Sequence, residues 1–98
     1  MFSNKSADSC PWRVVWITGA GRGIGAALAK HLCRLGCTVY GSSRSLDELI
    51  QIQRAMAATP GRFIPVPLDI RRPAQISALF ERWGKEGVSP DLMVLNAG

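Results

Sequence analysis

Four glycines alternate with other residues in the segment Thr18-Gly-Ala-Gly-Arg-Gly-Ile-Gly25. An apolar run typical of a buried strand precedes this segment, and an amphipathic stretch typical of a helix follows it. Backbone N–H groups at the start of a helix lack partners within the helix, and the helix dipole favours negative charge there. Glycines allow a phosphate to approach because they carry no Cβ. The segment predicts a pyrophosphate-binding turn formed by Thr18, Gly19, Gly21, Arg22, Gly23, Ile24 and Gly25.

Glycine-rich segments also occur in plain tight turns and in mononucleotide P-loops. A plain turn is possible because loops collect glycine. A P-loop is excluded because no Lys-Ser or Lys-Thr pair follows Gly25. The flanking strand and helix patterns favour dinucleotide binding over the plain turn, because a dinucleotide fingerprint requires both of them.

A second polar group, Ser42-Ser43-Arg44, ends the next apolar run of the chain. An acidic side chain at this place would bind the 2′-hydroxyl of NAD and repel a 2′-phosphate. A guanidinium with two hydroxyls instead matches a phosphate in geometry and charge. Arg22 adds a second cation on the same side, so we expect NADP(H) to be preferred over NAD(H), with Ser43 and Arg44 at the phosphate. The alternative is that Arg44 is a solvated side chain ahead of a helix.

Alternating apolar and amphipathic stretches organise the rest of the chain around these two groups. Strands are expected at 13–18, 38–42, 62–68 and 91–96, and helices at about 24–35, 45–58 and 73–85. This order predicts a doubly wound α/β fold, with a parallel sheet covered by helices on both faces. Pro65 and Pro67 remove backbone donors, so the third strand should lie at or near a sheet edge.

Apolar residues at helical spacing predict the buried faces of two of the helices. Arg72 at the cap position of the third helix is a poor choice, although Pro73 suits a first helical position. The faces are Ile24, Ala27, Leu28, Leu32 and Leu35 in the first helix, and Ile76, Leu79, Phe80 and Trp83 in the third.

Two motifs in register resemble those of a known family. Thr18-Gly19-x-x-x-Gly23-x-Gly25 is similar to the cofactor motif of the short-chain dehydrogenases/reductases, and Asn96-Ala97-Gly98 is similar to the end of their Asn-Asn-Ala-Gly motif. The resemblance covers residues 13–98 and implies the N-terminal βαβαβαβ portion of a Rossmann fold of the classical type. It further implies that Asp69 and Ile70 border the adenine, and that Asn96, Ala97 and Gly98 lie beside the adenosine ribose and brace the sheet. Leu95 stands where the family usually has its first Asn.

The resemblance implies a reaction, hydride transfer between NADPH and a carbonyl or alcohol substrate. The family performs it with a Ser and a Tyr-x-x-x-Lys motif located beyond the Asn-Ala-Gly segment. This chain has one tyrosine, Tyr40, followed four residues later by Arg44, and we expect it to pack within a strand. No catalytic residue is assigned, and it stays open whether the chain by itself is an enzyme.

The position of these motifs predicts the domain organisation. We expect residues 13–98 to form the NADP-binding half-domain of a longer reductase, truncated before the catalytic part, and residues 1–12 to be a loose N-terminal segment. The alternative is a non-catalytic NADPH-binding module that pairs with a partner. In the strand order that the resemblance implies, the fourth strand is the last one present here. Its residues Leu92, Met93, Val94 and Leu95 would leave an apolar sheet edge uncovered, which predicts self-association.

Composition excludes several other classes of protein. With 98 residues, 47% hydrophobic and 19% charged, the chain fits one globular domain and neither a disordered tail nor a disulfide scaffold. The net charge of +5 favours an anionic partner, but the arginines are too scattered for nucleic-acid binding. One histidine and three cysteines without a C-x-x-C pair predict no metal site. No segment fits a secretory signal or a membrane span, so a cytoplasmic location is expected.

Overall fold

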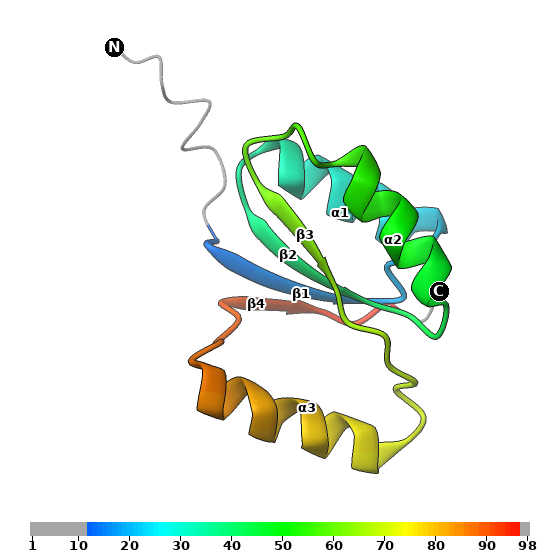
Figure 1. Cartoon of the computed structure of the whole chain (residues 1–98), viewed down its shortest axis with the longest axis vertical. Helices are drawn as coiled ribbons and strands as arrows, with labels where there is room; N and C mark the ends of the chain where they lie inside the picture. Colours follow the sequence, from blue (N-terminus) through cyan, green and yellow to red (C-terminus); the bar gives the residue numbers. More distant parts are fainter. Residues whose placement is uncertain (1–11, 97–98) are drawn as a thin grey trace.

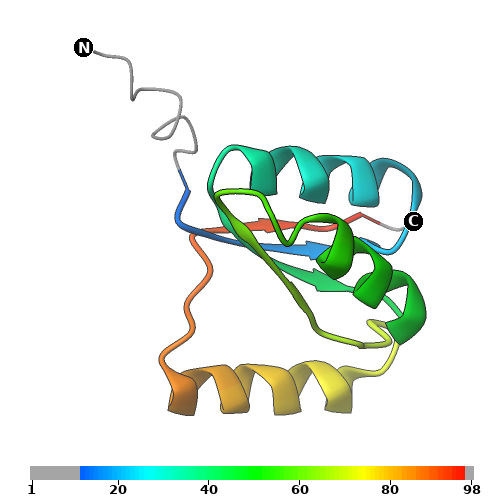
Figure 2. The same ribbon diagram turned by 45° about the horizontal axis from the view of Figure 1, so that its top comes forward.

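The structure is a computed structural model that describes residues 12–96. Four strands and three helices alternate along the chain, as Figure 1 shows: Val14–Thr18 (β1), Gly23–Arg34 (α1), Thr38–Ser42 (β2), Leu46–Ala55 (α2), Arg62–Pro65 (β3), Pro73–Glu86 (α3) and Leu92–Val94 (β4). The strands form one parallel sheet in the order β3-β2-β1-β4. Helices α1 and α2 cover one face of the sheet and α3 the other (Figure 2). The doubly wound α/β fold predicted from the sequence is therefore confirmed.

Strand register brings the two polar groups of the sequence to the same end of the sheet. Along β1 and β2 the pairing runs from Val14 opposite Thr38 to Thr18 opposite Ser42. Ala20 continues the ladder by donating its N–H to the Ser42 carbonyl oxygen at 2.9 Å. The glycine turn after β1 and the tip of β2 therefore lie side by side.

Each face of the sheet carries its own apolar cluster. Val15, Ile17 and Val39 are fully buried under α1 and α2. Trp16 faces α3, where its ring packs edge-to-face on Trp83 with centroids 5.4 Å apart. Strand alternation therefore assigns neighbouring residues of β1 to opposite layers of the molecule.

The buried face of α1 differs from the prediction. Ile24, expected inside, is 81% exposed, and Ala27 is also exposed. The residues that do face the sheet are mostly small: Gly25, Ala26, Ala29, Leu32 and Cys33. A helix start that approaches the sheet this closely selects small side chains, so the prediction is wrong for Ile24 and Ala27. Leu32 is buried as predicted, and Leu28 and Leu35 are partly buried against the core. In α3, Leu79 and Trp83 are buried as predicted, whereas Phe80 is half-exposed.

Strand β3 lies at an edge of the sheet, as its prolines predicted, but it is shorter than expected and ends at Pro65. Beyond that point the chain still follows β2, because the N–H groups of Val66 and Leu68 donate to the carbonyl oxygens of Gly41 and Ser43. The prolines occupy the alternate positions, which have no donor to offer. This path carries residues 69 and 70 to the tip of β2.

Candidate cofactor site

The turn between β1 and α1 presents an open helix N-terminus at the carboxyl end of the sheet. Gly19 and Gly23 have φ angles of 65° and 64°, a region that side chains other than glycine rarely adopt. A Cβ on Gly25 would lie 2.0 Å from the Gly19 carbonyl oxygen, so the helix starts in direct backbone contact with the turn. No acidic residue lies in the first turn of α1, and the cap residue Arg22 forms no side-chain cap bond. The N–H groups of this turn are thus left for an anion.

Asn96 fastens the turn to the end of β4. Its backbone N–H donates to Thr18 Oγ1 at 3.0 Å, and the Thr18 hydroxyl donates to the Asn96 carbonyl oxygen at 3.2 Å. Its side-chain Nδ2 donates to the Gly19 carbonyl oxygen at 3.1 Å. Thr18 is 1% exposed, so it supports the turn from beneath. The neighbouring Leu95 is 77% exposed.

A cavity of about 410 Å³ opens beside the hydrogen bonds that Asn96 forms with the turn. The glycine turn, the tip of β2 and the loop after β3 all contribute to its wall. Most of the residues predicted for the adenosine end of the cofactor are therefore brought together. The lining residues are Gly19, Ser42, Ser43, Arg44, Leu68, Asp69, Ile70, Arg71 and Asn96.

A smaller cavity of about 170 Å³ lies between the glycine turn and the start of α2. Arg22 borders it from the loop after β1 and Arg44 from the loop after β2, and neither forms an ion pair within residues 12–96. Its remaining lining residues are Gly19, Gly21, Ser43, Ser45 and Glu48. Two cations facing one small cavity make it suitable for a doubly charged anion.

Asp69 is held in a fixed, ionised form at the mouth of the larger cavity. Arg71 donates to its carboxylate from Nε at 3.0 Å, from Nη2 at 3.1 Å and from its backbone N–H at 3.0 Å. These bonds, with a smaller contribution from the Arg44 charge, lower the pKa of Asp69 from 3.8 to about 2. The side chain is 14% exposed, and its oxygens are directed to the loop itself.

Some of the predicted residues do not offer a side chain to a ligand in these cavities. Ile24 points outward at the start of α1 and lines neither of them. Ser42 is fully buried and its hydroxyl accepts the Trp16 Nε1–H at 2.9 Å, so this hydroxyl is not the phosphate ligand that the sequence suggested. Ala97 and Gly98 lie outside the described residues.

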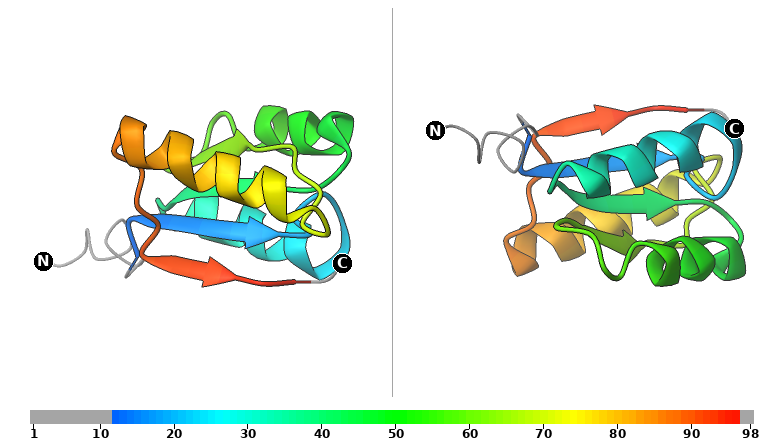
Figure 3. Two further views of the ribbon diagram at one scale, coloured as in Figure 1. Left: turned by 90° about the horizontal axis from the view of Figure 1, so that it is seen from below. Right: turned by 90° about the horizontal axis from the view of Figure 1, so that it is seen from above.

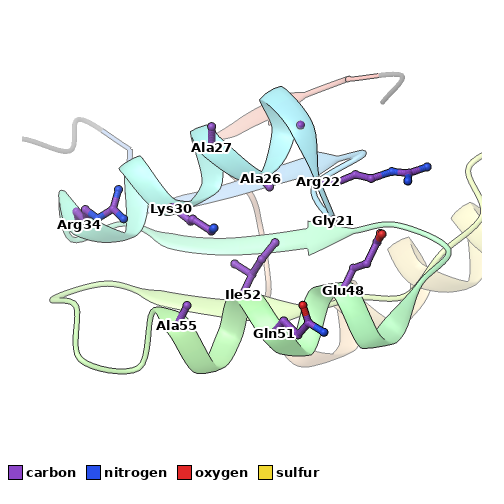
Figure 4. A pocket seen from close by; sticks show the side chains of 11 residues that line it. Gly21, Arg22, Ala26, Ala27, Lys30, Arg34, Glu48, Gln51, Ile52 and Ala55 are labelled. Atoms are coloured by element: carbon purple, nitrogen blue, oxygen red, sulfur yellow. The ribbon is translucent and has the colours of Figure 1, made fainter.

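The sequence interpretation missed Glu48, which lines the smaller cavity, and the groove that this side chain shares. A wider cavity of about 680 Å³ runs between α1 and α2 (Figure 4). Its lining residues are Gly21, Arg22, Gly23, Ala26, Ala27, Lys30, Arg34, Glu48, Gln51, Ile52 and Ala55. In the sequence the spacing of Ser45 and Glu48 fits a helix capping box. The short distance along the chain from Arg44 was the one available signal of a role in the site.

Other reactive side chains are occupied in packing. Tyr40 contacts the Trp83 ring with centroids 5.3 Å apart, which confirms its expected packing role. Cys33 is fully buried, and burial raises the pKa of its thiol to about 11. In the described part of the chain no three His, Cys, Asp or Glu residues gather as metal ligands. Across residues 12–96 the helices are too short or too polar to cross a bilayer.

Comparison with known proteins identifies the family. The short chain dehydrogenase model matches residues 13–98, which begin one residue before β1. The chain belongs to the short-chain dehydrogenase family. Its resemblance to that family in the glycine turn and in the Asn96 segment is thereby confirmed.

Members of this family are similar to the chain in sequence and in fold. Dehydrogenase/reductase SDR family member 1 of Mus musculus is 37% identical over 86 residues, which are 87% of this chain and 28% of the mouse protein. A metagenomic short-chain oxidoreductase in complex with NADP superposes with a TM-score of 0.78 at 33% identity, covering 88% of this chain and 39% of that one. L-sorbose reductase from Gluconobacter frateurii, complexed with NADPH and L-sorbose, gives 0.77 at 29% identity, covering 88% and 33%. The chain thus spans less than a third of the mouse relative's length.

Proposed function

We propose that residues 13–98 form the NADP(H)-binding half-domain of a short-chain oxidoreductase, and that the whole protein transfers hydride between NADPH and a carbonyl or alcohol substrate. The pair Arg22 and Arg44 carries the proposed preference for NADP(H), because both line the smaller cavity. Neither is neutralised by an ion pair within residues 12–96. Relatives of similar fold bind NADP or NADPH, which supports the same choice.

The geometry of the glycine turn fits a dinucleotide. The first turn of α1 would hold the pyrophosphate, since Gly19 and Gly23 adopt the left-handed backbone of the turn and Gly25 lets the helix begin directly against it. The larger cavity would hold the adenosine, with Asp69 and Ile70 at the adenine. When bound, the nicotinamide end supplies or accepts the hydride. The residues of this chain would bind the dinucleotide and orient it.

Proton transfer to the substrate requires an acid or base at the reacting oxygen. Tyr40, the one tyrosine of the sequence, packs on Trp83 and does not line the larger cavities. We therefore assign this step to a Ser and a Tyr-x-x-x-Lys motif outside these residues. The packing of Tyr40 also fits the alternative function, a non-catalytic module that binds NADPH and pairs with a partner protein. NADPH consumption by the intact protein with a panel of aldehydes and ketones separates the two functions.

The cofactor preference is tested by calorimetric titration with NADPH and NADH. Wild-type protein is expected to bind NADPH more tightly than NADH. Arg44→Ser is expected to weaken NADPH binding about tenfold to a hundredfold, the usual effect of losing a hydrogen bond to a charged group. NADH binding should change little, because it carries no 2′-phosphate.

Arg54→Ser is the matched control for that variant. Arg54 is an exposed arginine in the last turn of α2 and lines none of the cavities described above. The Arg54→Ser variant loses the same positive charge as Arg44→Ser, so a general electrostatic effect would weaken NADPH binding equally in both variants. Equal loss in both, or equal affinity of the wild type for the two nucleotides, would overturn the proposed preference.

A further inference from the structure

Glu48 occupies the third position of α2, where a glutamate usually completes a capping box. The first half of the box is present, because the Glu48 N–H donates to Ser45 Oγ at 3.3 Å. In the second half the glutamate would accept the Ser45 N–H. That N–H instead donates to Ser43 Oγ at 2.9 Å. The Glu48 carboxylate is therefore not required at the cap.

The carboxylate lies against the glycine turn instead. A Cβ placed on Gly21 would be 2.6 Å from Glu48 Oε1 and 3.0 Å from Ser43 Oγ. Figure 4 shows the Glu48 side chain directed from α2 towards Gly21, at the end of the groove where Arg22 lies. The missing side chain of Gly21 thus provides the space that the carboxylate uses.

This position places a negative charge in a cavity that otherwise carries two cations. Glu48 lines the 170 Å³ cavity together with Arg22 and Arg44. It forms no ion pair with either arginine among the described residues, so its position is not fixed by a direct bridge. Glu48 also lines the 680 Å³ groove between α1 and α2, which provides room for the side chain to withdraw.

We infer that Glu48 is a specificity-determining residue for the cofactor, because its carboxylate competes with the 2′-phosphate for the space between Gly21 and Arg44. The inference rests on the proposed NADP(H) site. A phosphate entering this cavity is repelled until the carboxylate moves away, whereas a neutral 2′-hydroxyl is not. The Glu48 carboxylate therefore reduces the difference in affinity between NADP(H) and NAD(H) that the two arginines create.

Adenosine 2′,5′-bisphosphate and 5′-AMP are suitable probes, since they differ by the 2′-phosphate alone. Glu48→Gln keeps the size of the side chain and removes its charge. At low salt we expect this variant of the intact protein to bind the bisphosphate about threefold to tenfold more tightly than wild type, as expected for removing one charge a few ångströms away in a partly solvated site. The affinity for 5′-AMP should stay within about twofold of the wild-type value, because its 2′-hydroxyl is uncharged.

Asp47→Asn is the matched control. Asp47 precedes Glu48 in the first turn of α2, is exposed, and does not line the phosphate cavity. The Asp47→Asn variant changes the net charge and the helix terminus in the same way as Glu48→Gln. Because Asp47 does not line the 170 Å³ cavity, this variant should leave the affinity for both probes unchanged. Glu48→Ala should repeat the tighter bisphosphate binding, which excludes a new hydrogen bond from the glutamine amide as its cause. Thermal unfolding of each variant checks that the fold is retained.

The outcomes separate this inference from the proposed function. If Arg44→Ser weakens bisphosphate binding while Glu48→Gln has no effect, the inference is overturned and the NADP(H) site stands. The inference is also overturned if Glu48→Gln and Asp47→Asn tighten binding equally, or if Glu48→Gln weakens it. If no folded variant binds either probe, both proposals fail. Tighter bisphosphate binding by the Glu48 variants, with Asp47→Asn unchanged, would support the inference.

Discussion

At position 25 the lack of a side chain determines how closely α1 approaches β1. An added Cβ would meet the Gly19 carbonyl oxygen at 2.0 Å and Asn96 Nδ2 at 2.7 Å. The first contact is with backbone, which has little freedom to move. The second would disturb the side chain that fastens the turn to β4.

We expect Gly25→Ala to lower the free energy of unfolding by about 2 kcal/mol or more, because an overpacked site must shift its backbone. Nucleotide binding should fall with it, since the start of α1 moves. Urea unfolding and calorimetric titration measure the two effects. A variant with wild-type stability and affinity would show that the helix start adapts without cost.

The Asp69 carboxylate predicts a pH dependence at the same scale. Its pKa is about 2 in the folded protein and 3.8 ordinarily, so its contribution to stability is complete above about pH 5 and is lost as the pH falls towards 2. Urea unfolding at a series of pH values should show wild type losing stability relative to Asp69→Asn across this range. Carboxyl chemical shifts should give a midpoint near 2 for Asp69. A midpoint near the ordinary value would contradict the Arg71 contacts.

Single residues differ in how far sequence alone determines their role. The glycine turn was predictable because the positive φ angles of Gly19 and Gly23 and the backbone contact of Gly25 strongly favour glycine. Glu48 was not, because its position depends on which acceptor takes the Ser45 N–H, and both Ser43 and Glu48 were available. Ser42 was misplaced for a similar reason, since its hydroxyl is bonded to Trp16 from a different strand.

Among the elements, α3 and its end contain two glycines in opposite environments. Gly84 lies inside the helix, and a Cβ there would have nothing within 4 Å. Gly87 ends the helix with a φ angle of 75°, and its N–H donates to the Trp83 carbonyl oxygen. The first glycine has no structural need to be glycine, whereas the second adopts a conformation that favours it.

Gly84→Ala should therefore raise the free energy of unfolding by about 0.5–1 kcal/mol, through the better helix propensity of alanine. Gly87→Ala should lower it by about 1 kcal/mol, because of the left-handed backbone. Urea denaturation of the pair gives the sign directly, and each variant serves as the control for the other. Stabilisation by both would show that the end of α3 does not keep its left-handed turn in solution.

Element order and the edge position of β3 were predictable from the sequence, because the apolar patterns alternate between strand and helix and the two prolines disfavour a central place. The edge position of β4 was predicted from the family resemblance. The buried faces of the helices were less predictable from the sequence. The spacing of large apolar residues assigned Ile24 to the interior, whereas close packing on the sheet selected glycine and alanine. Strand ends also differed, since β3 and β4 end at Pro65 and Val94 although their neighbours β2 and β1 each continue for one more residue.

At the scale of the whole molecule, the two sheet edges are unequal. Along the β3 edge, prolines remove donors on the outer side. Figure 3 shows β4 along the opposite edge, with β1 as its neighbour. Met93 and Leu95 on this side are 53% and 77% exposed. An apolar edge of this kind favours pairing with another strand.

We expect the 98-residue chain to self-associate through this edge in a concentration-dependent way, and sedimentation velocity measures it. Leu95→Lys should shift the distribution towards monomer, because a charge on an edge strand opposes pairing. Leu46→Lys, at an exposed apolar position on α2, is the control and should have no effect. Monomeric wild-type chain at all concentrations would contradict this expectation.

The bond from the Trp16 indole to Ser42 has a practical consequence. It crosses from the aromatic layer beneath α3 to the residue immediately before Ser43 and Arg44. A change at the tip of β2 is therefore expected to alter the environment of this buried fluorophore. The indole proton of Trp16 should exchange slowly with solvent and shift when a nucleotide occupies the site. Trp16 is thus expected to serve as an internal spectroscopic reporter of nucleotide binding.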